Sequence, residues 1–168
     1  VFYCDDEAKR IIRGDAEVKA ALRQIVGEEV YAPDGTLAKP VLAAHLCKGR
    51  EAAAQVDAVV HPRVAQAFAA FAERHAGAVF MECALLFEAL FDRFVDCSLL
   101  VSAPLNVRLQ RVMRRDNISE ACALKWIGLQ MPEEEKARRA DYVLPNAGGE
   151  DTRQLLEEFL EKITTVRK

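Results

Sequence analysis

Four short apolar runs, separated by stretches of helical periodicity, constrain the fold of this chain more than any other feature of its sequence. The runs occupy residues 1–4, 78–83, 95–103 and 140–146. They read as strands, whereas apolar residues between them recur every three or four positions, as on one face of a helix. Parallel strands need helical crossovers, so the alternation predicts an α/β fold with a mostly parallel sheet flanked by helices on both faces.

Caps and breaking residues set the bounds of the helical stretches. We predict helices over residues 6–13, 15–26, 37–46, 104–115, 120–131, 133–139 and 151–166. A longer helical pattern, from Glu51 to Ala76, contains the dipeptide His61-Pro62. Proline lacks the backbone N–H group and its ring clashes with the preceding turn, so this pattern predicts two helices, the second starting near Pro62.

The composition fits one soluble, folded domain. The chain has 168 residues, of which 51% are hydrophobic, with only 8 Gly and 6 Pro, and this excludes disordered and fibrous classes. The formal net charge of −3 argues against general affinity for nucleic acid, because neutralising phosphates requires a basic face. Any anionic ligand must therefore be held by local charge. We expect a monomer or a weak homo-oligomer.

The five cysteines indicate the compartment. They are scattered and odd in number, and none belongs to a Cys-x-x-Cys pair or to a Cys/His cluster with metal-ligand spacing, so they are predicted to be reduced thiols. No signal peptide and no apolar run near 18 residues is present, so no membrane partner is expected. These features predict a cytoplasmic protein. The cysteines are Cys4, Cys47, Cys83, Cys97 and Cys122.

Acidic residues end the first two predicted strands. Asp5 follows the first run, and Glu82 interrupts the second. Asp5 has two interpretations: it caps the next helix, which this stretch alone favours, or it belongs to a site, because ligands bind at the carboxyl ends of parallel strands. Burying Glu82 without a partner would be costly, so it is expected to face a cation, a metal-bound water or the site.

Basic residues gather on the predicted helix 104–115. Arg108, Arg111 and Arg115 recur on one face, and Arg114 lies beside them. They form either a solvated surface or a phosphate-binding set, and the sequence favours neither. The run 133–139, Glu-Glu-Glu-Lys-Ala-Arg-Arg, reads by composition as a solvated helix.

His61, next to Pro62, is more simply a hydrogen-bonding residue at a helix junction than a catalyst.

The two carboxylates and the arginine-rich helix together suit phosphoryl transfer. One carboxylate can accept a hydroxyl proton, the other can hold Mg²⁺ through water, and guanidinium groups can neutralise the transferring group. No side chain is predicted to ligate a metal ion directly.

Seven strings in order resemble the dephospho-CoA kinase family. Each is weak alone, but together they span nearly the whole chain. The strings are Cys-Asp-Asp-Glu-Ala-Lys-Arg (4–10), Asp-Gly-Thr-Leu (34–37), His-Pro-Arg-Val (61–64), Glu-Cys-Ala-Leu-Leu-Phe-Glu (82–88), Ala-Pro-Leu-Asn-Val-Arg-Leu-Gln-Arg-Val-Met-Arg-Arg-Asp (103–116), Gln-Met-Pro-Glu-Glu-Glu-Lys (130–136) and Arg-Ala-Asp-Tyr-Val-Leu-Pro-Asn (139–146).

The resemblance implies a P-loop kinase of the nucleoside-monophosphate-kinase type, a single kinase domain over residues 1–168. Such an enzyme uses ATP and Mg²⁺ to phosphorylate the ribose 3′-hydroxyl of dephospho-CoA, the last step of coenzyme A biosynthesis. A helical substrate lobe would span residues 27–76, and a lid would span residues 116–139.

The resemblance also implies site residues. Asp5 would be the catalytic base, assisted by Arg115. The substrate-binding residues would be Glu82, His61, Arg63 and Leu85. The nucleotide-binding residues would be Arg111, Arg115, Arg139, Asn146 and Gly148, the last two beside adenine.

The sequence also departs from the family pattern. A loop of the form Gly-x-x-x-x-Gly-Lys-Ser/Thr, which cradles the phosphates, does not occur in it. We therefore expect about 25–30 residues before Val1, the length of a strand, loop and helix, and no kinase activity from the chain as written. Tyr3 replaces a frequent Asp, Ala84 a frequent Pro, and Pro145 a frequent acid.

Three alternatives remain open. The chain is a kinase of the same fold with another small-molecule or nucleotide acceptor, or a non-catalytic remnant that binds CoA-like ligands, or a receiver-like signalling domain suggested by Asp5-Asp6. The receiver reading is the weakest, because Glu82 and Asn146 stand near the places where that fold needs an Asp and a Lys.

Overall fold

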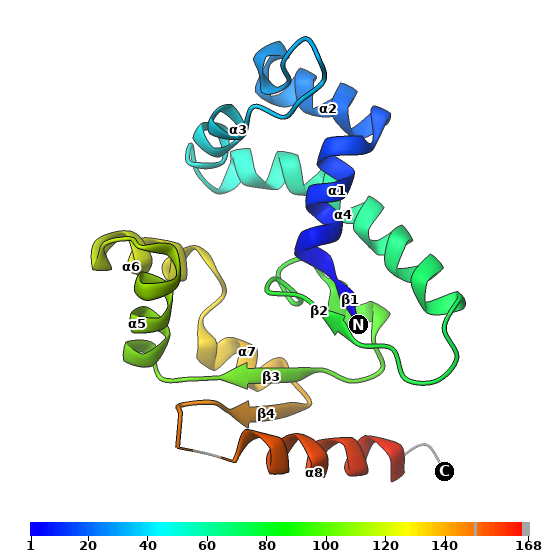
Figure 1. Ribbon diagram of the computed structural model, residues 1–168, viewed down its shortest axis with the longest axis vertical. Helices are drawn as coiled ribbons and strands as arrows, with labels where there is room; N and C mark the ends of the chain where they lie inside the picture. Colours follow the sequence, from blue (N-terminus) through cyan, green and yellow to red (C-terminus); the bar gives the residue numbers. More distant parts are fainter. Residues whose placement is uncertain (150, 166–168) are drawn as a thin grey trace. The chain divides into compact units, whose positions relative to one another are not determined.

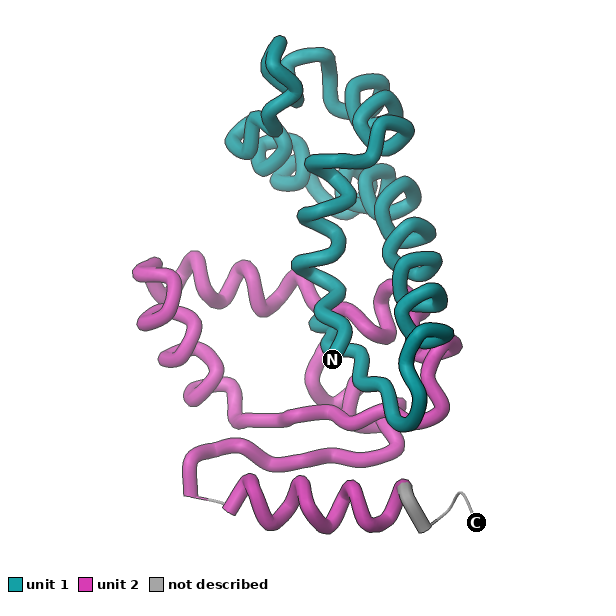
Figure 2. The backbone as a smooth tube through the Cα atoms, turned by 45° about the vertical axis from the view of Figure 1, so that its right-hand side comes forward, with its two compact units in different colours: residues 1–84 teal, residues 85–168 magenta. Residues whose placement is uncertain are grey.

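The computed structural model describes residues 1–149 and 151–165, and these form two compact units, residues 1–84 and 85–168 (Figure 2). Each unit contains one pair of parallel strands with helices around it (Figure 1). The α/β class and the parallel strand direction predicted from the sequence are confirmed. In the described residues the ladders join the strands as two pairs, whereas the sequence predicted one sheet.

The first unit is mainly helical. Its elements are β1 (Phe2–Tyr3), α1 (Cys4–Gly14), α2 (Ala16–Val26), η1 (Glu28–Val30), α3 (Lys39–Leu46), α4 (Arg50–Glu73) and β2 (Met81–Glu82). Asp15 separates α1 from α2 and caps α2, because its carboxylate accepts hydrogen bonds from the N–H groups of Glu17 and Val18 at 2.9 and 3.0 Å. The core of this unit includes Val18, Leu22 and Val64, each at most 2% exposed.

The helix α4 crosses His61-Pro62 without a break, so the predicted division into two helices was wrong. The apolar stripe of this helix, Val56, Val60, Val64 and Phe68, is buried on both sides of the proline. Burying each such side chain contributes about 1.5–3 kcal/mol, against about 3 kcal/mol lost at an internal proline. Packing of the continuous stripe therefore outweighs the local penalty.

The strands β1 and β2 are short but well placed. Phe2 pairs with Met81 and Tyr3 with Glu82, and the Phe2 N–H group donates to the Phe80 carbonyl at 2.7 Å. Phe2 packs on Phe68 of α4, with ring centroids 5.4 Å apart. This packing anchors the first strand on the helical layer.

The second unit carries the other strand pair. Its elements are η2 (Phe91–Phe94), β3 (Leu99–Ser102), α5 (Leu105–Asp116), α6 (Glu120–Leu129), α7 (Glu133–Arg139), β4 (Tyr142–Pro145) and α8 (Thr152–Thr165). The parallel register runs from Leu99 opposite Tyr142 to Ser102 opposite Pro145. On one side of the pair α8 packs against β4, with the rings of Tyr142 and Phe159 5.2 Å apart (Figure 1). Val166, the predicted end of the last helix, lies outside the described residues.

A carboxylate fixes the start of the β3–β4 pair. Asp141 accepts hydrogen bonds from the hydroxyl and the N–H group of Ser98 at 2.7 and 2.8 Å, and these bonds lower the pKa of Asp141. The Asp141 N–H group donates in return to the Ser98 hydroxyl at 3.1 Å. Among the residues that the structure describes, no helix is long and apolar enough to cross a membrane.

Candidate functional site

The acidic part of the candidate site lies at the carboxyl ends of β1 and β2, within the first unit. Glu82 ends β2 opposite Tyr3, and Asp5 stands in the first turn of α1, two residues past Tyr3. The side chain of Cys83 is the largest cause that raises the pKa of the Cys4 thiol, followed by burial, and the charges of Glu82 and Asp5 raise it further. The two acids therefore share one end of this strand pair.

Asp5 is not the helix cap that the isolated stretch favoured. The helix α1 begins at Cys4 with Tyr3 at its N-cap, and no side chain caps it. The neighbouring acids are paired: Asp6 accepts from Lys9 at 3.1 Å, and Glu7 from Arg10, which lowers the pKa of Glu7. Among the described residues, no hydrogen bond or ion pair holds the carboxylate of Asp5. It is an exposed carboxylate available to a ligand.

Glu82 is exposed, so the predicted desolvation cost does not arise. The sequence placed it inside an apolar run, but the strand ends at this residue and the side chain reaches solvent. Glu82 thus also remains available to a cation or a polar ligand. A hollow of about 500 Å³ in the same unit has a lining that includes Tyr3, Asp6, Phe71 and Arg74, and none of the predicted site residues lines it.

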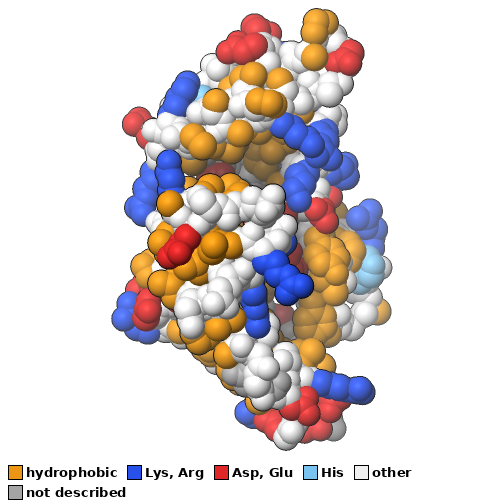
Figure 3. All heavy atoms as spheres, turned by 60° about the vertical axis from the view of Figure 1, so that its left-hand side comes forward, with side chains coloured by type: hydrophobic (Ala, Val, Ile, Leu, Met, Phe, Trp, Pro, Cys, Tyr) orange, Lys and Arg blue, Asp and Glu red, His pale blue; other side chains and the backbone are white. Residues whose placement is uncertain are grey.

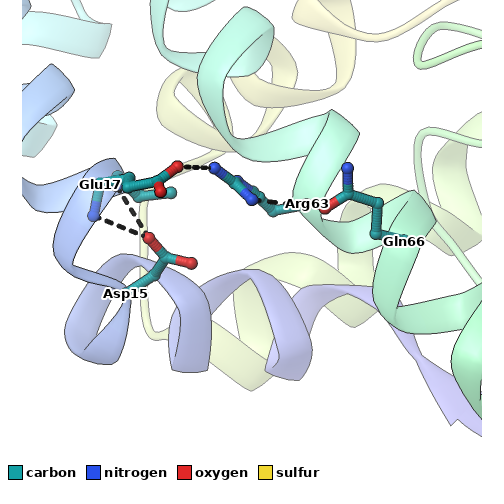
Figure 4. Close-up of polar contacts among 5 residues, drawn as sticks. Asp15, Glu17, Arg63 and Gln66 are labelled. Carbon is teal, nitrogen blue, oxygen red and sulfur yellow. Dashed lines mark hydrogen bonds and ion pairs between the residues drawn. The ribbon is translucent and has the colours of Figure 1, made fainter.

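Arg63 and His61 lie on α4 and have partners within the first unit. The guanidinium of Arg63 forms an ion pair with Glu17 at the start of α2, and it also donates to Gln66 at 3.4 Å (Figure 4). His61 Nε2 lies 3.5 Å from Asp57 Oδ1, one helical turn away. Since α4 is continuous, His61 is a mid-helix residue, and its predicted place at a helix junction was wrong.

The second unit contains a hollow of about 440 Å³ at the carboxyl ends of β3 and β4. Its lining includes Ser102, Arg108, Glu133, Pro145 and Ala147. Arg108 Nε donates to the Ala103 carbonyl at 3.0 Å, and its NH1 lies 3.6 Å from Glu133 Oε2. The other carboxylate oxygen of Glu133 is buried without a hydrogen-bond partner. The hollow therefore combines apolar walls with the fixed cation of Arg108 and the carboxylates of Glu133 and Glu134.

Sequence reasoning did not select Arg108 as a site residue. The arginines of α5 indicated a possible phosphate-binding set, but their periodicity alone does not say which arginine lies near the strand ends. Arg108 lies one helical turn after Pro104, so it is the member closest to the start of α5. Its bond to Ala103, directly after β3, fixes it at the hollow.

Two of the predicted nucleotide residues approach each other. A Cβ atom on Gly148 would lie 4.0 Å from Arg111 NH2, and Gly148 has a φ of +113°, which other residues rarely adopt. Asn146 follows β4 directly, and its N–H group donates to the Ser102 carbonyl at 2.7 Å. Arg111, Asn146 and Gly148 thus flank the end of β4.

The remaining predicted arginines are held by acids on their own helices. Arg115 of α5 binds Asp116 at 2.8 Å, which raises the pKa of Arg115 and lowers that of Asp116. Arg139 of α7 binds Glu135 at 2.9 Å. Both guanidiniums are substantially exposed. Leu85 is half-buried in the turn that opens the second unit, where its carbonyl accepts from the Ala89 N–H group.

The composition of α7 had predicted a solvated helix, but one of its charged side chains is buried. Lys136 is 8% exposed, and its ammonium lies 3.1 Å from Glu88 Oε1. Burial alone would raise the pKa of Glu88, but the Met131 N–H group and Lys136 hold that pKa below its ordinary value. On the face drawn in Figure 3, Lys and Arg side chains lie in separate groups with acids among them.

Acids at one strand end and arginines around another are the kinds of residues that phosphoryl transfer requires in an α/β fold. The chain belongs to the dephospho-CoA kinase family, whose model matches residues 1–151, and it is a kinase. A dephospho-CoA kinase of Bacteroides fragilis strain YCH46 is 36% identical over 97% of this chain and 78% of the relative. One from Salinibacter ruber is 38% identical over 88% of this chain and 76% of the relative.

Solved structures support the fold. A crystal structure from Thermus thermophilus matches with a TM-score of 0.79 and 33% identity, over 96% of this chain and 83% of that one. A dephospho-CoA kinase from Campylobacter jejuni matches with a TM-score of 0.66 over 99% of this chain and 86% of that one. Its 20% identity supports the fold alone. The predicted family and the P-loop kinase fold are confirmed.

Proposed function

We propose that this kinase transfers the γ-phosphoryl group of ATP to the ribose 3′-hydroxyl of dephospho-CoA, giving CoA and ADP, the last step of coenzyme A biosynthesis. The observation that carries the proposal is the unpaired carboxylate of Asp5 at the carboxyl end of β1. A general base must be within hydrogen-bond reach of the acceptor hydroxyl and ready to take its proton. The first turn of α1 carries three acids, and Asp6 and Glu7 each pair with a cation, whereas the carboxylate of Asp5 has no such partner among the described residues.

Asp5 accepts the hydroxyl proton as the 3′-oxygen attacks the γ-phosphorus, and the bond from the γ-phosphorus to the bridging oxygen breaks. Glu82, on the neighbouring strand, orients the acceptor or a metal-bound water. Guanidinium groups spread the charge of the transferring group, and we assign this role to Arg115 and Arg139. Both can leave their carboxylate partners at little cost, because exposed ion pairs contribute only about 0–1 kcal/mol.

Mg²⁺ suits the donors at this strand end. The ion prefers oxygen ligands and keeps several waters, so it is bound by one or two carboxylates and by substrate phosphates. Glu82 supplies an exposed carboxylate there, whereas no described cluster of three or more acidic, His or Cys side chains could hold an ion by itself. Bound there with ATP, Mg²⁺ would neutralise charge on the β- and γ-phosphates.

We assign the nucleotide base to the hollow at the ends of β3 and β4. Its apolar walls fit a flat aromatic ring, and the buried Glu133 oxygen without a partner is an acceptor for an exocyclic amine. Arg111, Asn146 and Gly148 would line the rim. We assign the substrate lobe to residues 27–76, with His61 and Arg63, and the lid to residues 116–139, with Leu85 at the substrate side.

The acceptor decides between this proposal and another small-molecule kinase. The enzyme, expressed from its complete coding sequence, is assayed with ATP and Mg²⁺ against dephospho-CoA, AMP, CMP and shikimate. Dephospho-CoA should have the highest kcat/KM, and a clear preference for another acceptor would contradict the assignment. Residues 1–168 alone contain no Gly-x-x-x-x-Gly-Lys-Ser/Thr loop, so we expect that polypeptide to bind dephospho-CoA without turnover.

A further inference from the structure

The hollow at the carboxyl ends of β3 and β4 contains a carboxylate that receives no hydrogen bond. Glu133 lines this hollow, and its side chain is only 19% exposed. Its Oε1 atom is buried without a partner, and its Oε2 atom lies 3.6 Å from Arg108 NH1, beyond hydrogen-bond reach. Among the described residues, no donor therefore satisfies Glu133. Buried polar groups are normally hydrogen-bonded, so this exception points to a ligand.

The neighbouring cation is fixed in place but keeps most of its donors. Arg108 Nε donates to the Ala103 carbonyl at 3.0 Å, which holds the guanidinium directly after β3. A guanidinium has five N–H donors, and this bond uses one of them. The others bond to no residue that the structure describes. The Arg108–Glu133 pair thus offers a ligand two acceptor oxygens and several donors side by side.

The walls around the Arg108–Glu133 pair are mostly apolar. They include Ala103, Pro104, Leu105 and Val143, and the hollow has a volume of about 440 Å³. Sites for small molecules measure about 300–1,000 Å³ and combine apolar walls with a few polar groups that fix the orientation of the ligand. The lining therefore fits a flat heteroaromatic ring, and the Arg108–Glu133 pair selects what that ring carries on its edge.

The edge of guanine matches these two side chains. Guanine presents two adjacent donors, N1–H and N2–H, and beside them the acceptor O6. The two oxygens of a carboxylate can accept both donors at once, and an arginine donates to O6. Rotation about the last torsion of a Glu side chain, which is broad, turns both oxygens toward the ring. Adenine uses one oxygen for its 6-amino group and one guanidinium donor for N1.

We propose that this hollow takes guanine as well as adenine nucleotides, so that GTP is a second phosphoryl donor of the enzyme. Glu133 accepts from N1–H and N2–H of guanine, and Arg108 donates to O6. The inference rests on the proposed function, which places the nucleotide base in the hollow. The γ-phosphoryl group passes to the ribose 3′-oxygen, the bridging oxygen leaves with GDP, and the hydroxyl proton goes to the general base.

Donor selectivity tests the proposal. The enzyme, expressed from its complete coding sequence, is assayed with Mg²⁺ and dephospho-CoA against ATP, GTP and purine riboside triphosphate. We expect kcat/KM for GTP to lie within tenfold of that for ATP. Purine riboside triphosphate, whose base has no N–H donor on this edge, should be at least tenfold poorer than either. A kcat/KM for GTP more than tenfold below that for ATP would overturn the proposal.

A variant links the selectivity to the hollow. Glu133→Gln keeps one acceptor oxygen, which serves adenine, but replaces the other with an N–H donor, which opposes guanine. It should lower kcat/KM for GTP at least tenfold and for ATP less than threefold. The control is Glu157→Gln on α8, whose carboxylate pairs with Arg153 outside the hollow, and it should leave both values unchanged. Equal losses with both nucleotides in Glu133→Gln would remove Glu133 from base recognition.

Binding without an acceptor separates this inference from the proposed function. Calorimetry with non-hydrolysable analogues of ATP and GTP requires no dephospho-CoA, and the two Kd values should differ by less than tenfold. If both analogues bind but dephospho-CoA is not phosphorylated, the proposed function fails and the dual base site stands. If dephospho-CoA is phosphorylated with ATP but the GTP analogue does not bind, the inference alone fails.

Discussion

Lys136 of α7 and Glu88, in the turn before η2, form a largely buried ion pair, with Nζ 3.1 Å from Oε1. Glu88 also accepts the Met131 N–H group at 2.8 Å, and Lys136 donates to Gln130 at 3.4 Å. The pair therefore ties α7 and the segment before it to the turn that opens the second unit. It makes Lys136 a structural residue of the predicted lid.

Removing Lys136 should destabilise the protein strongly. Lys136→Ala leaves Glu88 largely buried without its cation, and breaking such a pair costs about 3 kcal/mol or more. Arg138→Ala, on the same helix, is the control: its pair with Glu135 is mostly exposed and contributes less than about 1 kcal/mol. Urea unfolding of both variants measures the difference. Equal midpoints would show that the Glu88 pair does not stabilise the fold.

Acid should weaken the same contact. The pKa of Glu88 in the folded protein lies below its ordinary value, so the unfolded chain binds the proton more readily. This contribution is fully present above the unfolded pKa, about 4.3, and is lost as pH falls through the folded pKa. Unfolding free energy measured from pH 7 to pH 3 should decline less steeply in Glu88→Gln than in the parent. Identical slopes would exclude Glu88 as a source of the acid sensitivity.

Pro62 lies exposed inside a continuous helix, so replacing it should stabilise the protein. Pro62→Ala restores a backbone donor and removes a ring clash, with an expected gain of about 1–3 kcal/mol. Pro40→Ala is the matched control, because Pro40 stands in the first turn of α3, where its missing N–H group costs nothing. Thermal unfolding of both variants tests this. A loss of stability in Pro62→Ala would mean that the proline is needed where it stands.

Arg63 should contribute to substrate affinity. Its pair with Glu17 orients the guanidinium on α4, and a charge-assisted hydrogen bond contributes about 1.5–3 kcal/mol. Arg63→Ala should therefore raise KM for dephospho-CoA at least tenfold, with a smaller change in kcat. Gln66→Ala, which removes only a weak neighbour at 3.4 Å, should change KM little. Similar effects of both variants would remove Arg63 from the substrate site.

Much of the fold was predictable because local patterns determine it. The apolar runs lie within a few residues of β1 to β4, and Asp15 caps α2 where the predicted helices meet. The strand-end position of Asp5 also followed from chain order, because a helix starts directly after an apolar run. The predicted role of Asp5 as the catalytic base came instead from the family resemblance.

The features that were missed depend on contacts distant in sequence. Pro62 is tolerated because α4 buries its stripe against α1 and α2, and Lys136 is buried because Glu88 meets it from 48 positions earlier. The position of Arg108 at the hollow depends on where β3 ends. Composition and periodicity carry no information about such partners.

The central claim is that Asp5 is the general base, and Asp5→Asn tests it most directly. The enzyme from its complete coding sequence is assayed with ATP, Mg²⁺ and dephospho-CoA, and Asp6→Asn, whose carboxylate pairs with Lys9, is the matched control. The account predicts that kcat falls by about 10²–10⁴-fold in Asp5→Asn with little change in KM, while Asp6→Asn stays near the parent rate. Parent-like kcat in Asp5→Asn would contradict it.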